Sequence, residues 1–498
     1  MTEAQGLAAR LAAPLVLVTS AAVLVLEVLV SRLVAPYVGL TLETYTAAIG
    51  VALAAIAGGA AVGGRLADRV DPRRWLGPAT ALGGALVLVA RPTVFGVGDL
   101  FRGSGPAGTV VLVGLAAAPA VLVLSTVPPG VVKLRLRTLA ETGETVGRLS
   151  AVGTLGALAG TFLTGFVLLA ALPTSRLLLA VGVLLLVAGA LVAVLLARTA
   201  DVPPSGSLRA VAVLGALGAG WLLVADGPCQ AETRYYCASV LVDPERPSGR
   251  LLVLDGDRHS YVDLDDPWHL EFGYAQRIAE AVATLPPGPL DVLYLGAGGF
   301  SLPRYVAAAR PGSRATVLEV DPQVPRIARN ELGLDAVPGV RVVVGDARTT
   351  IADLPDDGFD VVVGDAFGSS AVPWHLTTEE MVGEVRRVLR RDGLYALNVI
   401  DYPPLAFARA EVATLRAVLP HVAVLAEPAV LRGAEGGNVV LVGSQRPLDV
   451  AALRAGLGGR EEGSVVGDPH AFVRDAEVLT DDHAPVDQLF TPYRRPRG

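Results

Sequence analysis

The nine residues DVLYLGAGG, residues 291–299, decide the fold of the second half of the chain. The run DVLYL is short and mostly apolar, which is typical of a buried strand. The loop after it contains Gly296, Gly298 and Gly299, and such small residues let a ligand approach the backbone, although a tight turn would need them too. Ser301 is placed to cap a following helix. The stretch therefore predicts a strand, a glycine loop and a helix in succession.

Strands and helices then alternate along the chain, which predicts a doubly wound parallel sheet with a Rossmann-like fold of the class I methyltransferase type. Upstream, Asp255-Gly256 predicts a β-hairpin within a small β-rich region, and a helix is expected at 270–285. Ser301 is expected to begin one helix, and Thr377 or Thr378 another that stops at Asp392-Gly393. Further strands are expected at 315–320, 340–344, 359–364 and 394–400, and further helices at 322–332 and 377–391.

Three carboxylates follow successive strands of this sheet: Glu319, Asp346 and Asp365. Ligands of such sheets bind at the carboxyl ends of the strands, so we expect these residues to converge with Gly296 and Gly298 on one pocket. A carboxylate after the second strand can accept both hydroxyls of a ribose, which suits NAD as well as S-adenosyl compounds. Asp346 precedes a helical stretch and could instead be a helix cap. The absence of a P-loop lysine disfavours ATP.

The first half of the chain has a different composition. The whole chain is 52% hydrophobic and 18% charged, against about 25% charged in soluble domains. Residues 1–226 carry a net charge of +5, and the remainder carries −12. The acidic balance argues against nucleic-acid binding, which requires a basic face. We therefore expect an α-helical polytopic membrane domain at 1–226, a β-rich lead-in with a helix at 227–286, and the Rossmann-like domain at 287–498.

A membrane-spanning helix needs about 20 mostly apolar residues. Seven segments of the first half are candidates, and the third and seventh are the shortest. The first is too long for a cleaved signal peptide and is followed by more spans. The candidates are Pro14–Leu33, Tyr45–Gly64, Trp75–Ala90, Gly108–Val127, Ser150–Leu172, Leu177–Ala197 and Ala210–Ala225.

Basic residues between these segments set their orientation. The amino-terminal tail and the even loops carry 11 Lys or Arg, and the odd loops carry 4, namely Arg32, Arg91, Arg102 and Arg176. The amino terminus is therefore expected in the cytoplasm. Seven spans would place the carboxyl-terminal half outside the cytoplasm, whereas six would return it to the cytoplasm.

Two further features belong to this half and its end. Cys229 and Cys237 are the only cysteines, and a nearby pair suggests a disulfide in an oxidising compartment, although two inert thiols are the alternative. No His or further Cys completes a metal-ligand set around them. Glu27 lies inside the first span, where a carboxylate is a candidate functional group, but a structural pair with Arg32 is the favoured interpretation.

With these motifs assembled, residues Arg250–Phe490 resemble the spermidine synthase family. The apolar half resembles the amino-terminal part of membrane-fused members, chiefly in LEVLVSRLVAPYVG. The resemblance implies transfer of an aminopropyl group from decarboxylated S-adenosylmethionine to an amine, putrescine in the family, on a methyltransferase-like Rossmann fold. The supporting motifs are LDGDRHS, LYLGAGG, VLEVD, VVGDA, FDVVVGDAF, PWHLTTEE and LTDDHAPVDQL.

The resemblance implies a role for individual residues. Glu319 would bind the ribose of the nucleoside, and Asp346 and Ala347 would contact its adenine. Asp365 matches the catalytic aspartate that holds and deprotonates the attacking amine, a role that requires a carboxylate within reach of the nucleophile. Tyr274 matches a tyrosine of the family's substrate pocket. His375, in the loop after Asp365, is the histidine best placed to line the pocket, although an ordinary polar residue is the favoured interpretation. His259 stands where the family has a glutamine near the nucleoside.

The sequence departs from the family at the end of the site that holds the polyamine. Gly299 replaces an aspartate of the glycine loop, Gly368 replaces a second aspartate, and Tyr274-Ala275-Gln276 replaces Tyr-His-Glu. A dicationic amine in a partly buried site needs carboxylate partners. The sequence therefore predicts an S-adenosyl-type donor more firmly than putrescine as acceptor.

Three functions stay open on these residues. The first is a membrane-anchored aminopropyl- or related alkyltransferase acting on a small amine. The second is an S-adenosylmethionine-dependent methyltransferase, and the third is a non-catalytic sensor or transporter. We expect the lipid bilayer as a partner, a possible homo-oligomer, and neither nucleic acid nor a metal ion.

Overall fold

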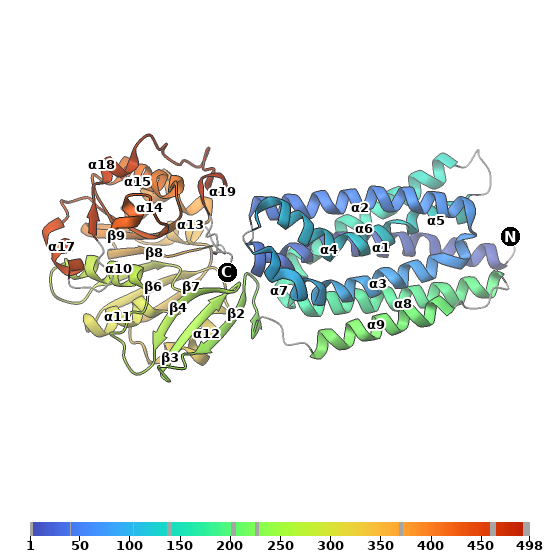
Figure 1. Ribbon diagram of the computed structural model, residues 1–498, viewed down its shortest axis with the longest axis horizontal. Coiled ribbons are helices and arrows are strands. Elements are labelled where there is room, and N and C mark those ends of the chain that lie inside the picture. Colours follow the sequence, from blue (N-terminus) through green and yellow to red (C-terminus); the bar gives the residue numbers. More distant parts are fainter. Residues whose placement is uncertain are drawn as a thin grey trace. The chain divides into compact units, whose positions relative to one another are not determined.

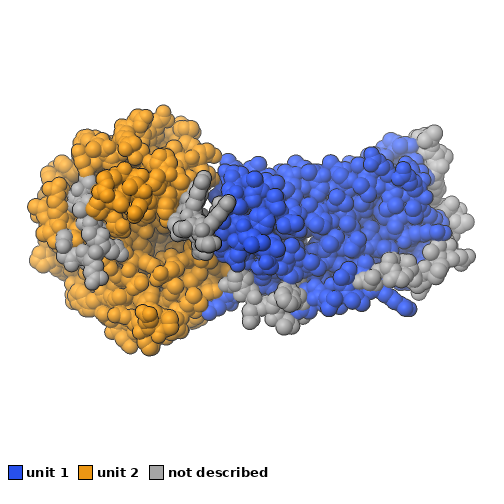
Figure 2. Space-filling model, in the orientation of Figure 1, with its two compact units in different colours: residues 1–234 blue, residues 235–498 orange. Residues whose placement is uncertain are grey.

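The computed structural model describes residues 3–39, 41–102, 104–136, 142–200, 206–224, 229–367, 372–458 and 465–491. The chain divides into two compact units, Met1–Arg234 and Tyr235–Gly498 (Figure 2). The first unit is a bundle of helices and the second is an α/β structure (Figure 1).

The first unit consists of long helices that follow one another through short turns. Thr41 and Asp71 cap two of these helices with their side chains, which satisfies backbone N–H groups that the helix cannot bond itself. The unit also contains a short strand, β1 (Ala231–Glu232). The helices and helical turns are α1 (Glu3–Val38), α2 (Leu42–Arg69), α3 (Pro72–Val97), η1 (Gly98–Phe101), α4 (Gly105–Ser125), α5 (Val127–Arg135), α6 (Thr142–Leu163), the π-helical turn η3 (Thr164–Leu168), α7 (Leu169–Ala171), α8 (Thr174–Ala200) and α9 (Gly206–Val224).

Within the described residues, six stretches of this unit are long and apolar enough to cross a bilayer. The seventh predicted segment lies in α9, where residues 211–220 form a shorter apolar stretch. The six are Arg10–Val38, Leu42–Arg69, Pro72–Phe101, Gly105–Arg135, Thr142–Ala171 and Thr174–Ala197.

The helices extend beyond the predicted segments, so several arginines that were expected in loops lie inside helices. Arg32 is part of α1, and Arg91 is part of α3. Arg91 is buried, with 7% of its surface exposed, and its guanidinium lies 3.7 Å from a carboxylate oxygen of Glu232. A paired guanidinium can be tolerated inside an apolar bundle, which explains why the helix continues through this residue.

Small residues let the helices pack closely, and these contacts give their directions. A Cβ at Gly156 of α6 would lie 2.4 Å from the carbonyl oxygen of Leu17, and one at Gly160 would lie 2.6 Å from that of Ala21. The contact therefore advances by four residues on both helices, so α1 and α6 run parallel.

Helix α9 has a defined direction relative to α3. Val211 packs in one cluster with Ala81 and Ala85, and a Cβ at Gly218 would lie 3.0 Å from the Cβ of Leu88. The contacts advance together on both helices, so α9 runs alongside α3 in the same direction (Figure 1).

The second unit begins with the antiparallel strands β2 (Cys237–Val242), β3 (Gly249–Leu254) and β4 (Asp257–Asp263). Asp255 and Gly256 both adopt positive φ, at 52° and 85°, which a type I′ hairpin turn requires. The predicted hairpin is therefore confirmed. The expected helix at 270–285 is α10 (Gly273–Ala283).

An eight-stranded sheet forms the centre of this unit, in the order β12-β10-β11-β9-β8-β5-β6-β7. Helices cover both of its faces, and two apolar clusters fill the space between the layers. The strands are β5 (Asp291–Leu295), β6 (Arg314–Glu319), β7 (Val340–Val344), β8 (Phe359–Gly364), β9 (Leu389–Asp401), β10 (His421–Ala426), β11 (Gly437–Ser444) and β12 (Val465–Gly467).

The predicted parallel sheet is correct for β5 to β9 and incomplete beyond them. Strand β11 pairs antiparallel with both β9 and β10, and β12 pairs antiparallel with β10. Between β10 and β11 the chain forms only the four-residue helix α16 (Pro428–Leu431). A parallel connection needs a crossover of a dozen or more residues, so this short link imposes the antiparallel arrangement.

Two predicted helix boundaries are corrected. Ser301 begins a helix, but Phe300 in the left-handed conformation precedes it and no side chain caps it. The helix after Thr378 ends at Val388 because the next strand already begins at Leu389. The remaining helices and helical turns are α11 (Ser301–Ala309), α12 (Val324–Glu331), η4 (Leu334–Ala336), α13 (Ala347–Thr350), η5 (Ile351–Asp353), η6 (Trp374–Leu376), α14 (Glu379–Val388), α15 (Ala406–Val418), α17 (Val450–Gly458), α18 (Pro469–Val473) and α19 (Val486–Leu489).

Candidate active site

The carboxyl ends of the parallel strands meet at one edge of the sheet, as predicted. Backbone hydrogen bonds join a residue just beyond one strand to the last residue of the neighbouring strand. Gly345 donates to the carbonyl of Glu319 at 2.9 Å, and Asp365 donates to the carbonyl of Leu295 at 3.0 Å. The loops that carry Glu319, Asp346 and Asp365 therefore start side by side, where ligands of such sheets bind.

The glycine loop fits tightly between two other segments of this unit. Gly296 has a φ of 71°, and a Cβ there would lie 2.7 Å from the carbonyl oxygen of Asp365. A Cβ at Gly298 would lie 2.4 Å from the Oγ of Ser260 on β4. The same Oγ accepts a hydrogen bond from the backbone N–H of Gly299 at 2.9 Å. The glycines are therefore needed both for the turn and for the close approach to β8 and β4.

Asp365 follows β8 and accepts a hydrogen bond on each carboxylate oxygen. The hydroxyl of Tyr274 on α10 donates to Oδ2 at 3.1 Å, and the amide of Asn398 on β9 donates to Oδ1 at 2.9 Å. Burial raises the pKa of Asp365 to about 6, although both hydrogen bonds act to lower it. Burial and the neighbouring Asp365 raise the pKa of Tyr274 well above 10, so Tyr274 keeps its proton. A carboxylate with a pKa near neutrality suits a general base.

A second hydrogen bond sets the orientation of Asn398. The amide of Asn438 on β11 donates to the side-chain carbonyl of Asn398 at 3.0 Å. Asn398 must therefore turn its own amide towards Asp365. The backbone carbonyl of Asn438 accepts a hydrogen bond from Arg277 at 3.2 Å, and Arg277 pairs with Glu427 at 3.3 Å. The catalytic candidate is thus held by a chain of polar groups that crosses three strands.

Sequence reasoning missed Asn398 and Asn438, although a signal existed for the first. Asn398 is the only polar side chain of LYALNVI apart from the tyrosine hydroxyl, and it is only 1% exposed. A buried polar group normally requires a partner, which the strand pattern alone does not identify.

Glu319 ends β6 and is buried, with 6% of its surface exposed. It accepts a hydrogen bond from the backbone N–H of Asp321 at 2.9 Å and another from the backbone of Ala297 in the glycine loop. Burial raises its pKa to about 7 despite these hydrogen bonds. Asp321 is fully buried, and its Oδ2 has no partner among the described residues. This corner of the site therefore presents carboxylate oxygens that can accept hydroxyl groups.

Asp346 serves as a helix cap and also faces a second loop. Its Oδ1 accepts the backbone N–H of Arg348 at 2.8 Å, which begins α13 with the buried Ala347. Its Oδ2 lies 3.1 Å from Nε2 of His375 in η6. The two interpretations of Asp346, a cap and a pocket residue, are therefore compatible.

His259 and Tyr236 border the site from the β-rich region. Nδ1 of His259 on β4 has no partner among the described residues, and burial lowers the pKa of this imidazole to about 4. The hydroxyl of Tyr236, which the sequence analysis missed, donates to the carbonyl of Phe367 at 2.8 Å. Burial, and secondarily the nearby Glu319, raise the pKa of Tyr236, so this phenol stays neutral.

Three further predictions concern other residues. Gly368 lies outside the described residues. Cys229 and Cys237 are both disulfide-bonded. Among the residues that the structure describes, no three His, Cys, Asp or Glu side chains are grouped as metal ligands would be.

Comparison with known proteins agrees with this geometry. A family model for a methyltransferase domain matches residues 293–397. A polyamine aminopropyltransferase of Vibrio vulnificus is 32% identical over 150 residues, which cover 29% of this chain and 50% of the relative. The carboxyl-terminal unit is spermidine synthase-like, with a methyltransferase fold. The chain spans about half the length of the aminopropyltransferases that head the comparison.

Two further proteins are similar to parts of this chain. An eEF1A lysine and N-terminal methyltransferase of Danio rerio is 31% identical over 121 residues, 22% of this chain and 18% of that protein. A crystal structure of a probable spermidine synthase from Corynebacterium glutamicum covers 54% of this chain and 100% of its own, with 28% identity and a TM-score of 0.48.

Proposed function

We propose that the chain is a membrane-anchored transferase that moves an aminopropyl or related alkyl group from a decarboxylated S-adenosylmethionine-type donor to a small amine. The observation that carries the proposal is Asp365, whose two oxygens are held by Tyr274 and Asn398 beside the glycine loop. In this reaction the amine nitrogen forms a bond to the carbon next to the sulfonium. The carbon–sulfur bond breaks, its electron pair stays on sulfur, and the amine proton passes to Asp365.

The donor would lie along the carboxyl ends of β5, β6 and β7. Glu319 would accept the ribose hydroxyls, and Asp346 and Ala347 would contact the adenine at the start of α13. The buried Oδ2 of Asp321, beside Glu319, supports this placement, because it has no hydrogen-bond donor among the described residues. Tyr274, His259 and His375 would line the remaining space.

The acceptor is proposed as an amine rather than as putrescine. Gly299 offers no side chain at the position where the family has an acid, and its N–H is already bonded to Ser260. Asp365 would then be the main anionic partner of the incoming nitrogen. A single carboxylate suits an amine with one ammonium group near the reacting centre better than a dication.

The direct test is turnover by the purified full-length protein with both donors and a panel of amines. We expect methylthioadenosine from decarboxylated S-adenosylmethionine, and its loss in Asp365→Asn. Formation of S-adenosylhomocysteine from S-adenosylmethionine alone would establish the methyltransferase function instead. Neither product with any amine would overturn both enzymatic functions and favour a sensor or transporter.

The methyltransferase is the second candidate because a methyltransferase-domain family matches residues 293–397. The Danio rerio methyltransferase is similar over 121 residues, 22% of this chain. This candidate uses the same nucleoside contacts and differs in the group that leaves the sulfonium. The two products named above therefore separate the candidates in one experiment.

We also propose that α9 is a seventh span and that the chain leaves the bundle on the side opposite its amino terminus. Arg32, near the end of α1, donates to the carbonyl of Thr233 at 3.0 Å. Glu232 lies beside Arg91, towards the end of α3, and accepts the N–H of Ser175 at the start of α8 at 3.0 Å. These contacts join residues 232–233 to the ends of α1 and α3 and to the start of α8, and α9 runs in the direction of α3 (Figure 1), which supports an odd number of crossings.

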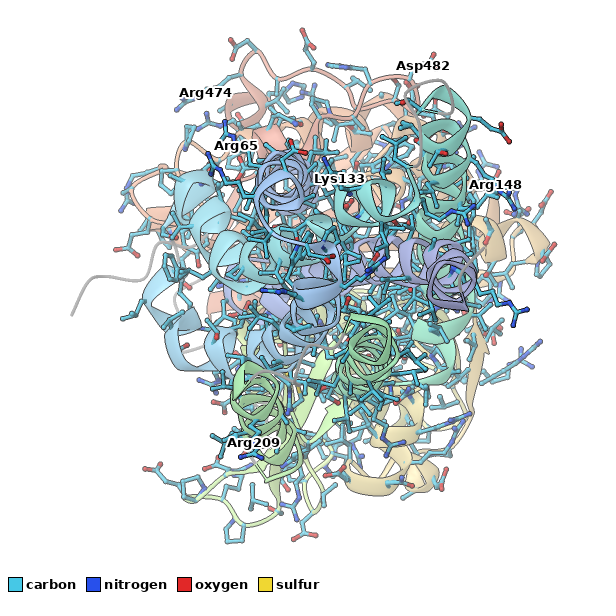
Figure 3. The ribbon with its side chains drawn as sticks, turned by 90° about the vertical axis from the view of Figure 1, so that its right-hand side faces the viewer. Arg65, Lys133, Arg148, Arg209, Arg474 and Asp482 are labelled. Atoms are coloured by element: carbon cyan, nitrogen blue, oxygen red, sulfur yellow. The ribbon has the colours of Figure 1, made fainter. Side chains whose placement is uncertain are left out.

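The opposite end of the bundle is the basic one. Arg65, Lys133, Arg148 and Arg209 come from four helices, α2, α5, α6 and α9, and are spread around the end of the bundle nearest the viewer in Figure 3. By the positive-inside rule that end faces the cytoplasm. The transferase unit would then be extracytoplasmic, where a disulfide of Cys229 and Cys237 is stable. A reporter fused to the carboxyl terminus of the full chain in intact cells tests this; activity of a cytoplasm-only reporter would overturn it.

A further inference from the structure

Glu27 is a carboxylate in the apolar part of α1 without a compensating charge. The expected pair with Arg32 does not form, because Arg32 donates instead to the backbone carbonyls of Thr233 and Arg234. Within the described part of the chain, no Lys, Arg or His lies within 4.0 Å of the Glu27 carboxylate. An ionisable group inside a membrane span usually faces a partner or a ligand.

The packing register of α1 and α6 indicates what lies opposite Glu27. Gly156 meets Leu17, and Gly160 meets Ala21, one turn further along both helices. One more turn brings Thr164 level with Val25, two residues before Glu27. Glu27 also lies seven residues, or two turns, after Ser20, whose Oγ is 3.2 Å from the place of a Cβ at Gly153. Glu27 therefore lies on the same side of α1 as Ser20, at the edge of the face that α6 covers.

The hydroxyl of Thr164 lacks the hydrogen bond that other threonines of the bundle make. Thr19, Thr80 and Thr161 each donate to the carbonyl four residues earlier, at 2.9, 2.9 and 3.1 Å. Thr164 is fully buried, at 0% exposure, yet its Oγ1 has no partner among the described residues. Every buried hydroxyl without a partner is unfavourable, so its retention requires a reason.

The backbone at Thr164 is also irregular. Thr164 begins the π-helical turn η3, in which the N–H of Leu169 bonds the carbonyl of Thr164. Such single π-helical turns are rare inside α-helices and frequently occur at functional sites. The turn, the unpartnered hydroxyl and the uncompensated carboxylate coincide at one level of the bundle.

We propose that Glu27 and Thr164 form a binding site for a primary ammonium group within the helical bundle. An ammonium offers three N–H donors and one positive charge, and the carboxylate and the hydroxyl oxygen accept such donors. An alkali cation would require more oxygen ligands than these two side chains provide. The site belongs to the first unit and goes beyond the proposed transfer reaction, which uses Asp365.

Binding of radiolabelled methylammonium to the full-length protein in lipid nanodiscs tests the site. We expect saturable binding that ammonium displaces and tetramethylammonium, which has no N–H donor, does not. Glu27→Gln should weaken binding roughly tenfold or more, and Thr164→Val roughly fivefold, because charge-assisted hydrogen bonds exceed neutral ones. Thr161→Val is the matched control and should bind as the wild type does.

Asp365→Asn distinguishes binding of methylammonium in the bundle from binding at the transferase site, because this variant should leave the bundle site intact. Binding lost in Asp365→Asn and retained in Glu27→Gln would overturn the proposal, as would equal binding by Thr164→Val and wild type, or no binding by the wild type. If Glu27→Gln fails to fold, Thr164→Ser, which keeps a hydroxyl, should retain the binding that Thr164→Val loses. An equal loss in both Thr164 variants would also overturn the site. These results hold whether or not the transferase reaction occurs, so the two proposals fail separately.

Discussion

Asp365 and Glu27 are both at least partly buried carboxylates, one in each unit, and they differ in their hydrogen-bond partners. Asp365 accepts a hydrogen bond on each oxygen, from Tyr274 and Asn398. Glu27 has neither a described hydrogen bond nor an ion pair. A carboxylate whose orientation is fixed by donors can exchange a proton with a substrate, whereas one without donors needs a ligand to supply them. The surroundings, not the residue type, therefore separate a proposed base from a proposed binding group.

The largest expected effect is that of removing the charge of Asp365. Asp365→Asn keeps the volume of the side chain and removes the base, so we expect the turnover number to fall roughly a thousandfold. Steady-state formation of methylthioadenosine measures this. The matched variant Glu27→Gln makes the same kind of change in the other unit and should leave the turnover within about twofold. Similar losses in both variants would remove the distinction between the two carboxylates.

A smaller effect on the turnover number is expected when the hydrogen bond from Asn398 to Asp365 is removed. Asn398→Leu deletes the amide that donates to Oδ1 and leaves Asn438 unpaired, so we expect the turnover number to fall about tenfold to a hundredfold. Because that hydrogen bond lowers the pKa of Asp365, its loss should also shift the acidic limb of the rate profile to higher pH. If the acidic side of the pH–rate profile, measured from pH 5 to 9, is unchanged in this variant, Asn398 has a purely structural role. Asn398→Gln, which keeps the amide, should recover part of the rate.

The pH dependence of the wild type follows from the raised pKa of Asp365, about 6. The base form is lost below that pH, so we expect kcat/KM to fall about tenfold per pH unit on the acidic side. Stability should change in the opposite sense. A raised pKa means that Asp365 holds its proton more tightly in the folded protein than in the unfolded chain, so its contribution to stability is greatest at low pH and declines as pH rises from about 4 to 6.

Chemical unfolding at a series of pH values measures this linkage. Asp365→Asn should remove at most about 3 kcal/mol of the decline, because the pKa of Asp365 is raised from 3.8 to about 6 and one pKa unit corresponds to about 1.4 kcal/mol. Glu319, with its pKa raised to about 7, contributes a similar decline that extends to higher pH and persists in this variant. A pH dependence identical in the variant and the wild type would contradict the burial of Asp365.

The smallest expected effect concerns the helix contact that positions Glu27. A Cβ at Gly160 would lie 2.6 Å from the carbonyl oxygen of Ala21, so Gly160→Ala should cost about 1–3 kcal/mol of bundle stability. Gly147 lies on the same helix with nothing within 4 Å of the place of a Cβ, so Gly147→Ala is the control. Thermal unfolding in nanodiscs compares them, and equal melting temperatures would mean that α1 and α6 do not pack as described.

Much of the site was predictable because strand ends follow simple rules. Gly296, Glu319, Asp346 and Asp365 each stand directly after an apolar run, and parallel strands bring such positions to one edge. Asn398 and Asn438 were not predictable, because their role depends on which strands are neighbours. Strands β9 and β11 are separated by α15, β10 and α16 in the chain, yet they pair side by side.

The sequence by itself determined the two-part composition, the apolar segments, the succession of the parallel strands along the chain and the carboxylates at their ends. These features depend on local periodicity and on residue type, which act over a few neighbouring positions. Only the tertiary structure decided that Asp365 is held by Tyr274 and Asn398, and that Arg32 bonds to Thr233 and Arg234 rather than to Glu27. Such pairings join residues from about 30 to 200 positions apart, and packing, which no local pattern encodes, selects them.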